Sequence, residues 1–401
     1  MSETIENKIA IEQKFIEQAQ QLCRGVEVLP DGHMGLAYKL QKAHNENRPL
    51  RVKLGLDPTR PDLHLGHSVV MRKLRQFQDL GHQVVLIVGG ATAMVGDPSG
   101  KSETRPALTK EQVNENAKSY FEQMSQVVDV KNAEVTNNAD WLHTMSFVEM
   151  LKLATSTTVA KMLTRDDFAK RYADGRPISV VEFFYPLMQA YDSVAVKADI
   201  ELGGTDQRFN LLMGRDVQAH YGFEDFQLAM LLPLIEGTDG QVKMSKTYPE
   251  HCISFTDSPK DMYGKLMSIP DELMPKYYLL LTDLDFNKDN NPRDEKMRLA
   301  FEIVRMYKGE EAANTAQNEF INVVQNKGIP DDIPEIKLSE AKNILDLLLE
   351  LNFVQSKGEA KRLIAGGGVK FEGEKISAID FVVEKNGVIQ GGKRKYAKIV
   401  F

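Results

Sequence analysis

The sequence is poor in cysteine and tryptophan and has no long apolar run. Two cysteines and one tryptophan among 401 residues exclude a disulfide framework and a four-cysteine zinc site. The longest apolar stretches, such as residues 84–88, are far shorter than the ~20 residues that span a membrane. The N-terminus is polar and of mixed charge, without the apolar segment of a secretory signal. These absences predict a soluble protein of the cytoplasm, with no membrane association and no zinc.

Charge is distributed unevenly along the chain. The whole sequence carries 50 Lys and Arg against 57 Asp and Glu, a net charge of −7, which excludes a general polycation. From Lys337 to the end there are 12 Lys and Arg against 8 Asp and Glu, whereas residues 1–336 have a net charge of −11. A basic end on an acidic body favours a polyanionic partner at that end. The alternative is that a small terminal domain is simply mildly basic.

The hydrophobic pattern predicts an α/β domain near the N-terminus. An amphipathic helical pattern covers residues 1–47, and a strand is predicted at 50–56, a helix at 65–80 and a second strand at 84–88. Strand, helix and strand within about forty residues form a βαβ unit, which implies a parallel sheet.

The rest of the chain divides into two further parts. Residues 107–195 and 259–327 follow helical patterns, and a Gly- and Pro-rich linker follows at 326–334. The last ~65 residues are predicted as two helices and short strands interrupted by glycines. The predicted domains are a Rossmann-like parallel-sheet domain with a helical insertion, an α-helical domain and a small α+β domain: 1–246, 247–330 and 337–401.

Two histidines stand where the first predicted strand gives way to a helix. His64 and His67 are three residues apart and therefore share a helical face, and Gly66 between them allows a flat ligand to approach the backbone. A helix N-terminus at the end of a parallel strand binds anions. Two histidines without nearby Cys or Glu ligands suit hydrogen bonds to phosphate oxygens better than metal binding. The alternative is two incidental surface histidines.

A pair of lysines follows much later, in Lys243-Met244-Ser245-Lys246. On a mobile loop, such lysines can close onto the charge that develops as pyrophosphate leaves, although alone they are typical of a solvated basic turn. A competing phosphate loop at residues 96–102 is excluded. It has three residues between its glycines where four are required, and its proline removes a backbone N–H.

Together, the segment His64-Leu65-Gly66-His67 and the lysine pair resemble the HIGH and KMSK signatures of class I aminoacyl-tRNA synthetases. The resemblance implies a two-step reaction. An amino acid carboxylate attacks the α-phosphate of ATP, and the acyl group then passes to the terminal ribose of a tRNA. ATP is the implied substrate, with Mg²⁺ accompanying it. The implied catalytic residues are His64, His67, Lys243, Lys246 and Thr59, and the implied ATP-binding residues are Asp57, Gly66, Asp206 and Lys246.

Three further segments, at residues 90–101, 185–192 and 203–207, resemble tyrosyl-tRNA synthetases. Tyr185, Gln189 and Asp192 share one helical face by their spacing. A buried carboxylate at the end of an aromatic pocket would reject phenylalanine, because phenylalanine has no hydroxyl and would leave the carboxylate without a hydrogen-bond partner. The roles that the resemblance implies are Asp97 on the substrate ammonium, Tyr185 and Gln189 on the amino group, Asp192 on the phenolic hydroxyl, Asp206 on the ribose hydroxyls and Gln207 near the carboxylate.

One position departs from the family pattern. Lys53 stands where many relatives have a tyrosine that shares the substrate hydroxyl, and we expect it to lie near Asp57 or Asp192. Tryptophanyl-tRNA synthetases are the nearest neighbouring family, but they usually lack an aspartate at the position of Asp192.

The C-terminal segment 359–373 resembles the S-four-like RNA-binding domain. The resemblance implies that Lys357, Lys361 and Arg362 contact RNA phosphates, extended by residues 393–395. The alternative is a solvated basic helix. The family is homodimeric, so the implied partners are tRNA(Tyr), L-tyrosine, ATP and a second copy of the chain.

Two other hypotheses remain at this point. A nucleotidyltransferase acting on a small acid would share the histidine pair but would not need a basic RNA module. A non-catalytic RNA-binding relative would be free to lose the two histidines and two lysines, and their presence counts against it.

Overall fold

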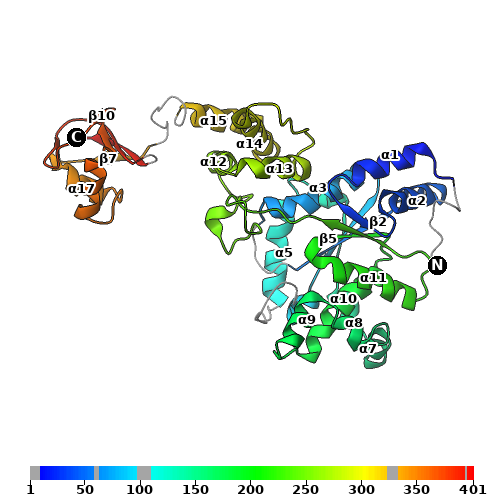
Figure 1. Ribbon diagram of the computed structural model, residues 1–401. Coiled ribbons are helices and arrows are strands. Elements are labelled where there is room, and N and C mark those ends of the chain that lie inside the picture. Colours follow the sequence, from blue (N-terminus) through cyan, green and yellow to red (C-terminus); the bar gives the residue numbers. More distant parts are fainter. Residues whose placement is uncertain (1–9, 58–62, 97–109, 323–332, 393–394) are drawn as a thin grey trace. The chain divides into compact units, whose positions relative to one another are not determined.

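The computed structural model describes residues 10–57, 63–96, 110–322, 333–392 and 395–401. The chain forms two compact units, residues 1–313 and 314–401, and each is described by itself (Figure 1). Within the described residues, no helix is long and apolar enough to cross a membrane.

The first unit is built on a six-stranded sheet with the order β1-β6-β5-β2-β3-β4. Strand β1 pairs with β6 in the antiparallel sense, and the other neighbours are parallel. The strands are β1 (Glu27–Leu29), β2 (Arg51–Leu56), β3 (Gln83–Val88), β4 (Glu134–Asn137), β5 (Ile200–Gly204) and β6 (Leu228–Leu232). The predicted parallel α/β sheet is therefore confirmed.

The strand order reverses between β2 and β5. Helix α3 (Leu65–Asp79) connects β2 to β3 in one direction along the sheet, and α11 (Arg208–His220) connects β5 to β6 in the other. Because such crossovers are right-handed, the two helices lie on opposite faces of the sheet (Figure 1). Open α/β sheets bind ligands at the carboxyl ends of the strands where this reversal occurs. The fold thus leads us to expect a ligand site after β2 and β5.

The central elements follow directly from their sequences. Strand β3 is continuously apolar, and Val84 to Ile87 are wholly buried, as expected of a strand with helices on both faces. Helix α3 buries one apolar stripe that includes Val69, Leu74 and Phe77. It is followed by Gly81, whose φ of +80° suits a glycine after a helix end.

Helices surround the sheet and extend beyond it. Before the sheet's second strand lie α1 (Gln13–Leu22) and α2 (Gly32–Asn45). Between β3 and β5 lie α4 (Thr92–Val95), α5 (Lys110–Met124), α6 (Ala139–Leu142), α7 (Phe147–Ala154), α8 (Val159–Met162), α9 (Asp166–Ala173) and α10 (Phe184–Ala195). After β6 come α12 (Pro259–Met267), α13 (Met274–Leu281), α14 (Pro292–Lys308) and α15 (Glu310–Phe320), the last of which crosses the division between the units.

Two short strands lie in segments that the sequence predicts as helical. Strand β1 interrupts residues 1–47, and β4 lies within residues 107–195. Each has three or four residues, too few to show the alternation of a strand. Both pair at the edges of the sheet, so their conformation depends on the neighbouring strand rather than on their own sequence.

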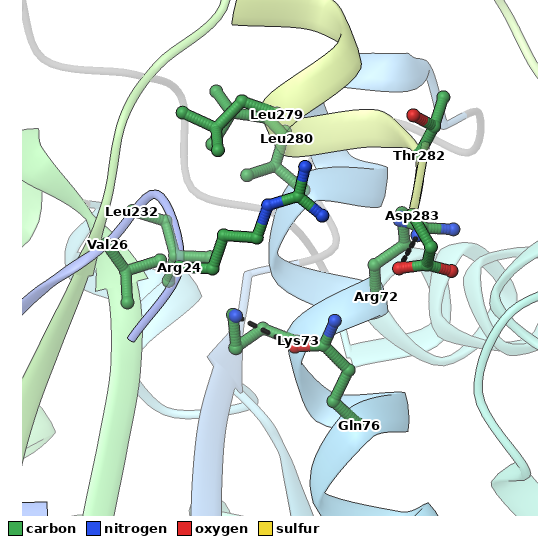
Figure 2. Close-up of a pocket in the computed structure, with 11 residues that line it drawn as sticks. Arg24, Val26, Arg72, Lys73, Gln76, Leu232, Leu279, Leu280, Thr282 and Asp283 are labelled. Carbon is green, nitrogen blue, oxygen red and sulfur yellow. Dashed lines mark hydrogen bonds and ion pairs between the residues drawn. The ribbon is translucent and has the colours of Figure 1, made fainter. Parts of the chain in front are cut away.

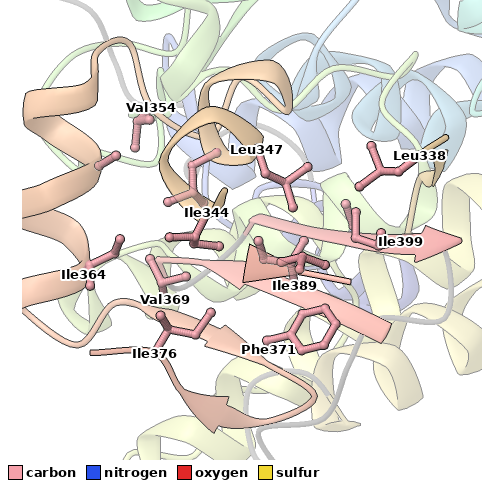
Figure 3. Close-up of a cluster of buried hydrophobic side chains, with 14 residues drawn as sticks. Leu338, Ile344, Leu347, Val354, Ile364, Val369, Phe371, Ile376, Ile389 and Ile399 are labelled. Carbon is pink, nitrogen blue, oxygen red and sulfur yellow. The ribbon is translucent and has the colours of Figure 1, made fainter. Parts of the chain in front are cut away.

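The second unit is a small α+β domain, as predicted. Its elements are β7 (Glu335–Lys337), β8 (Lys342–Asn343), α16 (Ile344–Glu350), α17 (Lys357–Ala365), β9 (Val369–Phe371), β10 (Glu374–Lys375), β11 (Val382–Val383), β12 (Gly387–Gly391) and β13 (Lys395–Val400). Five strands form a sheet in the order β10-β9-β12-β13-β7, and β11 pairs with β8. Both helices bury apolar side chains against this sheet in one core (Figure 3).

This core sets the stability of the second unit. Ile389 is wholly buried at its centre (Figure 3), so Ile389→Ala is expected to lower the free energy of unfolding by about 2–5 kcal/mol. The matched variant Ile379→Ala changes a side chain that is 47% exposed and should stay within about 0.5 kcal/mol of the wild type. Urea unfolding followed by circular dichroism measures both, and equal effects would contradict this packing.

Candidate active site

The histidine pair caps the N-terminus of α3. His64 Nδ1 accepts a hydrogen bond from the backbone N–H of Gly66 at 3.1 Å, and His67 Nδ1 accepts one from the backbone N–H of His64 at 3.2 Å. A nitrogen that accepts from a backbone N–H carries no proton in the neutral ring. Both rings therefore carry their proton on Nε2, as assigned from these hydrogen bonds. The ring centroids are 3.9 Å apart.

The electrostatic surroundings keep both histidines neutral. Burial, followed by the neighbouring His67 and Lys243, lowers the pKa of His64 to about 2. Burial and Lys243 lower the pKa of His67 to about 4. At neutral pH each ring is thus an uncharged donor through Nε2–H. This is the state that the predicted hydrogen bonds to phosphate require.

The lysine loop lies next to this helix end. The charge of Lys243 therefore acts on both histidine rings and lowers their pKa. A short hairpin carries the loop. The backbones of Lys243 and Glu236 form an antiparallel β-bridge across this hairpin. The backbone N–H of Met244 donates to Ile235 O at 2.8 Å. Met244 is buried and anchors the loop, while Lys246 on its far side is half-buried.

The chain that follows the loop is joined to the histidine segment by backbone hydrogen bonds. Leu65 N donates to Ile253 O at 3.0 Å, and Phe255 N donates to Leu63 O at 3.1 Å. These bonds hold together two segments that are far apart in the sequence. The structure therefore brings the two signatures to one place.

Lys243 also forms an ion pair with Asp206, with Nζ 2.8 Å from Oδ2. Asp206 follows the end of β5 and is the predicted partner of the ribose hydroxyls. In this conformation the predicted ribose-binding carboxylate is thus occupied by one of the predicted phosphate-binding lysines. Both side chains are substantially exposed, so the pair is weak and easily exchanged.

Asp57 directly follows β2, the other strand at the reversal. Its carboxylate accepts hydrogen bonds from the Tyr185 hydroxyl at 2.8 Å and from Thr92 Oγ1 at 3.0 Å. Gly89 permits this approach, since a Cβ on it would lie 1.9 Å from Asp57 Oδ1. The structure therefore connects Asp57, predicted at ATP, with Tyr185, predicted at the amino acid.

Asp192 is buried on α10. Its carboxylate accepts from Trp141 Nε1 at 2.9 Å and from Asn138 Nδ2 at 3.2 Å. Burial raises the pKa of Asp192 to about 7, while Lys53 and these two donors act in the opposite direction. The group therefore titrates close to neutrality, well above an ordinary aspartate.

Lys53, which we expect near Asp57 or Asp192, forms an ion pair with Glu201. Its Nζ lies 3.0 Å from Glu201 Oε1, and both side chains are almost wholly buried. The two residues are register partners on β2 and β5, so their side chains emerge on the same face of the sheet. The charge of Lys53 nevertheless reaches Asp192 and acts to lower its pKa against the larger effect of burial.

The remaining predicted amino-acid ligands meet at one asparagine. Asn210 Nδ2 donates to Gln189 Oε1 at 3.1 Å and to Gln207 Oε1 at 2.8 Å. The predicted residues Thr59 and Asp97 lie outside the described residues.

Sequence reasoning missed Asn138, Trp141, Glu201 and Asn210. Two of them carry a signal in hindsight. Glu201 is a charge inside an apolar strand, and Asn210 is three residues after Gln207, on the same helical face. Asn138 and Trp141 carry none, because only the tertiary structure brings them to Asp192.

The predicted RNA-binding residues lie on α17 of the second unit. Ala360 and Ile364 are buried, while Lys357, Lys361 and Arg362 are exposed. Lys357 is paired with Asp346 at 2.5 Å, an exposed pair of little strength.

No group of three or more His, Cys, Asp or Glu side chains is placed to hold a metal ion in the part of the chain that the structure describes. A pocket between α3 and α13 has Arg24, Arg72 and Lys73 in its lining (Figure 2). None of the predicted site residues that the structure describes lines this pocket.

The titration of Asp192 predicts a pH-dependent stability. An aspartate in the unfolded chain has a pKa of about 4, whereas the pKa of Asp192 in the folded chain is about 7. Between these values the folded state binds one more proton than the unfolded state, so the free energy of unfolding falls as the pH rises. From pH 5 to pH 8 the wild type should lose about 2–3 kcal/mol relative to Asp192→Asn. Urea unfolding at both pH values measures this, and parallel curves would place the pKa of Asp192 in its ordinary range.

Two protein families match the sequence. Residues 45–325 match the family described as tRNA synthetases class I (W and Y), and residues 325–399 match the Tyrosine--tRNA ligase SYY-like C-terminal domain. The chain is 56% identical over 363 residues to a tyrosine–tRNA ligase of Thermotoga maritima, covering 87% of this chain and 90% of that protein. It is 50% identical over 404 residues to a tyrosine–tRNA ligase of Moorella thermoacetica, covering 97% of each.

Solved structures share the fold. A C-terminally truncated mitochondrial tyrosyl-tRNA synthetase of Coccidioides posadasii superposes with a TM-score of 0.60 at 22% identity, covering 77% of this chain and 92% of that chain. Tyrosyl-tRNA synthetase of Aeropyrum pernix gives 0.58 at 20% identity, covering 78% and 99%. With the family matches and the identities over most of the chain, the chain belongs to the class I tRNA synthetases and, within them, to the tyrosine–tRNA ligases.

Proposed function

We propose that this chain activates L-tyrosine with ATP to give tyrosyl-adenylate and pyrophosphate, and then transfers tyrosine to the 3' end of tRNA(Tyr) in translation. Family membership supports the reaction. The observation that carries it is that the neutral histidine pair, which begins α3 after β2, lies beside the lysine loop, and that Lys243 of this loop pairs with Asp206 after β5.

In the first step a carboxylate oxygen of tyrosine forms a bond to the α-phosphorus, and the bond from that phosphorus to the pyrophosphate oxygen breaks. The substrate carboxylate is itself the nucleophile, so the step needs no general base. His64 and His67 donate their Nε2–H to oxygens of the α-phosphate, where charge develops. Lys243 and Lys246 stabilise the departing pyrophosphate. Mg²⁺ bound to ATP as part of the substrate would supply further positive charge at the phosphates.

The ion pair between Lys243 and Asp206 gives the loop a resting position. When the ribose hydroxyls of ATP take over the carboxylate of Asp206, its ammonium partner is displaced. Lys243 is then available to the phosphates. Nucleotide binding and closure of the lysine loop are coupled in this way through one exchangeable contact.

Tyrosine lies with its phenolic end at Asp192. The carboxylate accepts the phenolic O–H, and phenylalanine would leave it buried without that partner. Tyr185 and Gln189, together with Asp97, hold the amino group, and Gln207 lies at the carboxylate. Asp57 and Gly66 bind ATP, and Thr59 takes part in catalysis.

The domain assignments follow from these roles. Residues 1–246 form the catalytic domain, 247–330 the helical domain on the anticodon side, and 337–401 the RNA-binding domain. The exposed Lys361 and Arg362 on α17 support contacts with tRNA phosphates. The reaction belongs to the cytoplasm, where translation takes place.

A homodimer is the proposed assembly. The insertion between β4 and α10 exposes large apolar side chains, among them Phe147 at 76%, Val148 at 73% and Val180 at 71%. Exposed apolar residues gathered in one segment are typical of a protein interface. A second copy of the chain is the partner that the family implies.

Amino-acid-dependent exchange of pyrophosphate into ATP tests the activity. With each of the twenty amino acids supplied without tRNA, we expect exchange with tyrosine alone. Exchange with tryptophan would contradict the assignment of Asp192, and no exchange with any amino acid would favour a nucleotidyltransferase or a regulatory protein.

The same measurement tests the histidines. His64→Ala should slow adenylate formation by about 10²–10³-fold with little change in tyrosine affinity, because it removes a donor that acts in the transition state. His33→Ala changes an exposed histidine on α2 and should leave the rate within about twofold. An unchanged rate in His64→Ala would remove this residue from the mechanism.

Removal of residues 338–401 should separate the two steps. Pyrophosphate exchange should stay within about threefold of the wild type, whereas tRNA charging should fall by more than about 100-fold, because the phosphate contacts are lost. The double variant Lys361→Ala with Arg362→Ala keeps the fold and should weaken charging less, with a smaller salt dependence. Equal loss of both activities on deletion would make this domain structural.

A further inference from the structure

Two glutamines of the amino-acid site, Gln189 and Gln207, are joined through a third amide. Asn210 is buried, 1% exposed, on α11 and donates one N–H to the side-chain oxygen of each glutamine, at 3.1 and 2.8 Å. An amide presents an acceptor at its oxygen and donors at its nitrogen. The direction of this three-amide relay therefore decides which atoms face the ligand.

The direction is imposed from both ends by groups with one hydrogen-bonding sense. Arg165, which only donates, contacts Asn210 Oδ1 at 3.3 Å. Glu201, which as a carboxylate only accepts, receives Gln189 Nε2 at 3.2 Å. Each contact separately requires the same orientation of the amides. The relay therefore runs from the guanidinium to the carboxylate without ambiguity.

The accepting end of the relay is one partner of a buried ion pair. The Nζ of Lys53 lies 3.0 Å from Glu201 and donates to Gln189 O at 2.8 Å and Ser193 Oγ at 2.7 Å, which uses its three N–H groups. Glu201 also accepts from Gln227 Nε2 at 2.5 Å. A buried charge pair is tolerated when its remaining hydrogen-bonding positions are satisfied in this way.

The consequence falls on Gln207. Its oxygen is directed to Asn210, so its nitrogen is directed to the opposite side. A substrate carboxylate accepts hydrogen bonds and cannot donate them. An amide nitrogen that faces the substrate carboxylate donates a hydrogen bond to it, whereas an amide oxygen in the same place repels the carboxylate.

We propose that Asn210 and Glu201 are positioning residues that fix the direction of the Gln189–Asn210–Gln207 relay, so that Gln207 presents its amide nitrogen to the carboxylate of the amino acid. This inference rests on the proposed function, in which Gln207 lies at that carboxylate. Neither positioning residue needs to touch the substrate. Preorganised amides avoid the cost of turning at the moment of binding.

Comparison of tyrosine with tyramine, which lacks the carboxylate, tests the proposal. Asn210→Leu has a similar shape and releases Gln207, so in pyrophosphate exchange the KM for tyrosine should rise about 10-fold. The inhibition constant of tyramine, the KM for ATP and kcat should each stay within about threefold, because the hydrogen bond of Gln189 to Glu201 remains.

Asn210→Asp gives a stronger test of direction. The introduced carboxylate only accepts, draws the N–H of Gln207 toward itself and turns the amide oxygen to the substrate carboxylate. The KM for tyrosine should then rise about 100-fold, more than with leucine. If Asn210→Leu fails to fold, Asn210→Ser, which opens space instead of filling it, serves for the same comparison. A rise of the tyrosine and tyramine constants by equal factors would overturn the proposal, because it would show a purely structural role.

Gln207→Leu separates this inference from the assignment beneath it. With Gln207 at the carboxylate, the variant raises the KM for tyrosine at least about 10-fold and spares tyramine. If Gln207→Leu does so but the Asn210 variants change neither constant, the relay alone is wrong. If Gln207→Leu leaves the KM for tyrosine unchanged, the assignment of Gln207 is wrong and the relay has no role. Absence of tyrosine-dependent exchange in the wild type would instead reject the proposed function.

Discussion

The parallel pairing of β2 with β5 is the constraint on which the rest of the site depends. The pair has two ladder positions, Val52 with Ile200 and Lys53 with Glu201, and it joins segments that are far apart in the sequence. At this contact the chain reverses its direction across the sheet, which is where open α/β sheets bind ligands. The ion pair of Lys53 and Glu201 also specifies the register, because a slipped strand would leave a buried charge without its partner, at a cost of about 3–5 kcal/mol.

Burial gives the site its chemical character. The two histidines are kept uncharged by burial and by the nearby lysine loop, and their backbone hydrogen bonds select the Nε2–H form. Burial also raises the pKa of Asp192 to about 7. The hydrogen bonds that these groups form lie in a region of low dielectric, where such bonds are stronger than in water. The exposed pair of Lys243 and Asp206 is different, since it exchanges readily.

A further set of polar side chains contacts the predicted binding residues and not the substrate itself. Asn138 and Trp141 orient Asp192, and Asn210 joins Gln189 to Gln207. Together they restrict the orientations that the side chains of Asp192, Gln189 and Gln207 can adopt. A binding site held in this way requires little reorganisation when its ligand arrives.

The sequence by itself determined the elements with strong local signals and the chemistry with linear signatures. Helix α3 and strands β2 and β3 follow from hydrophobic period, and the histidine and lysine signatures are each contained within four residues. Strand β1 and the partners of Asp192 and Gln189 were decided only by the tertiary structure. The physical reason is that an edge strand and a buried polar network exist through neighbours remote in the chain, and local periodicity contains no information about which distant donor or acceptor satisfies a buried group.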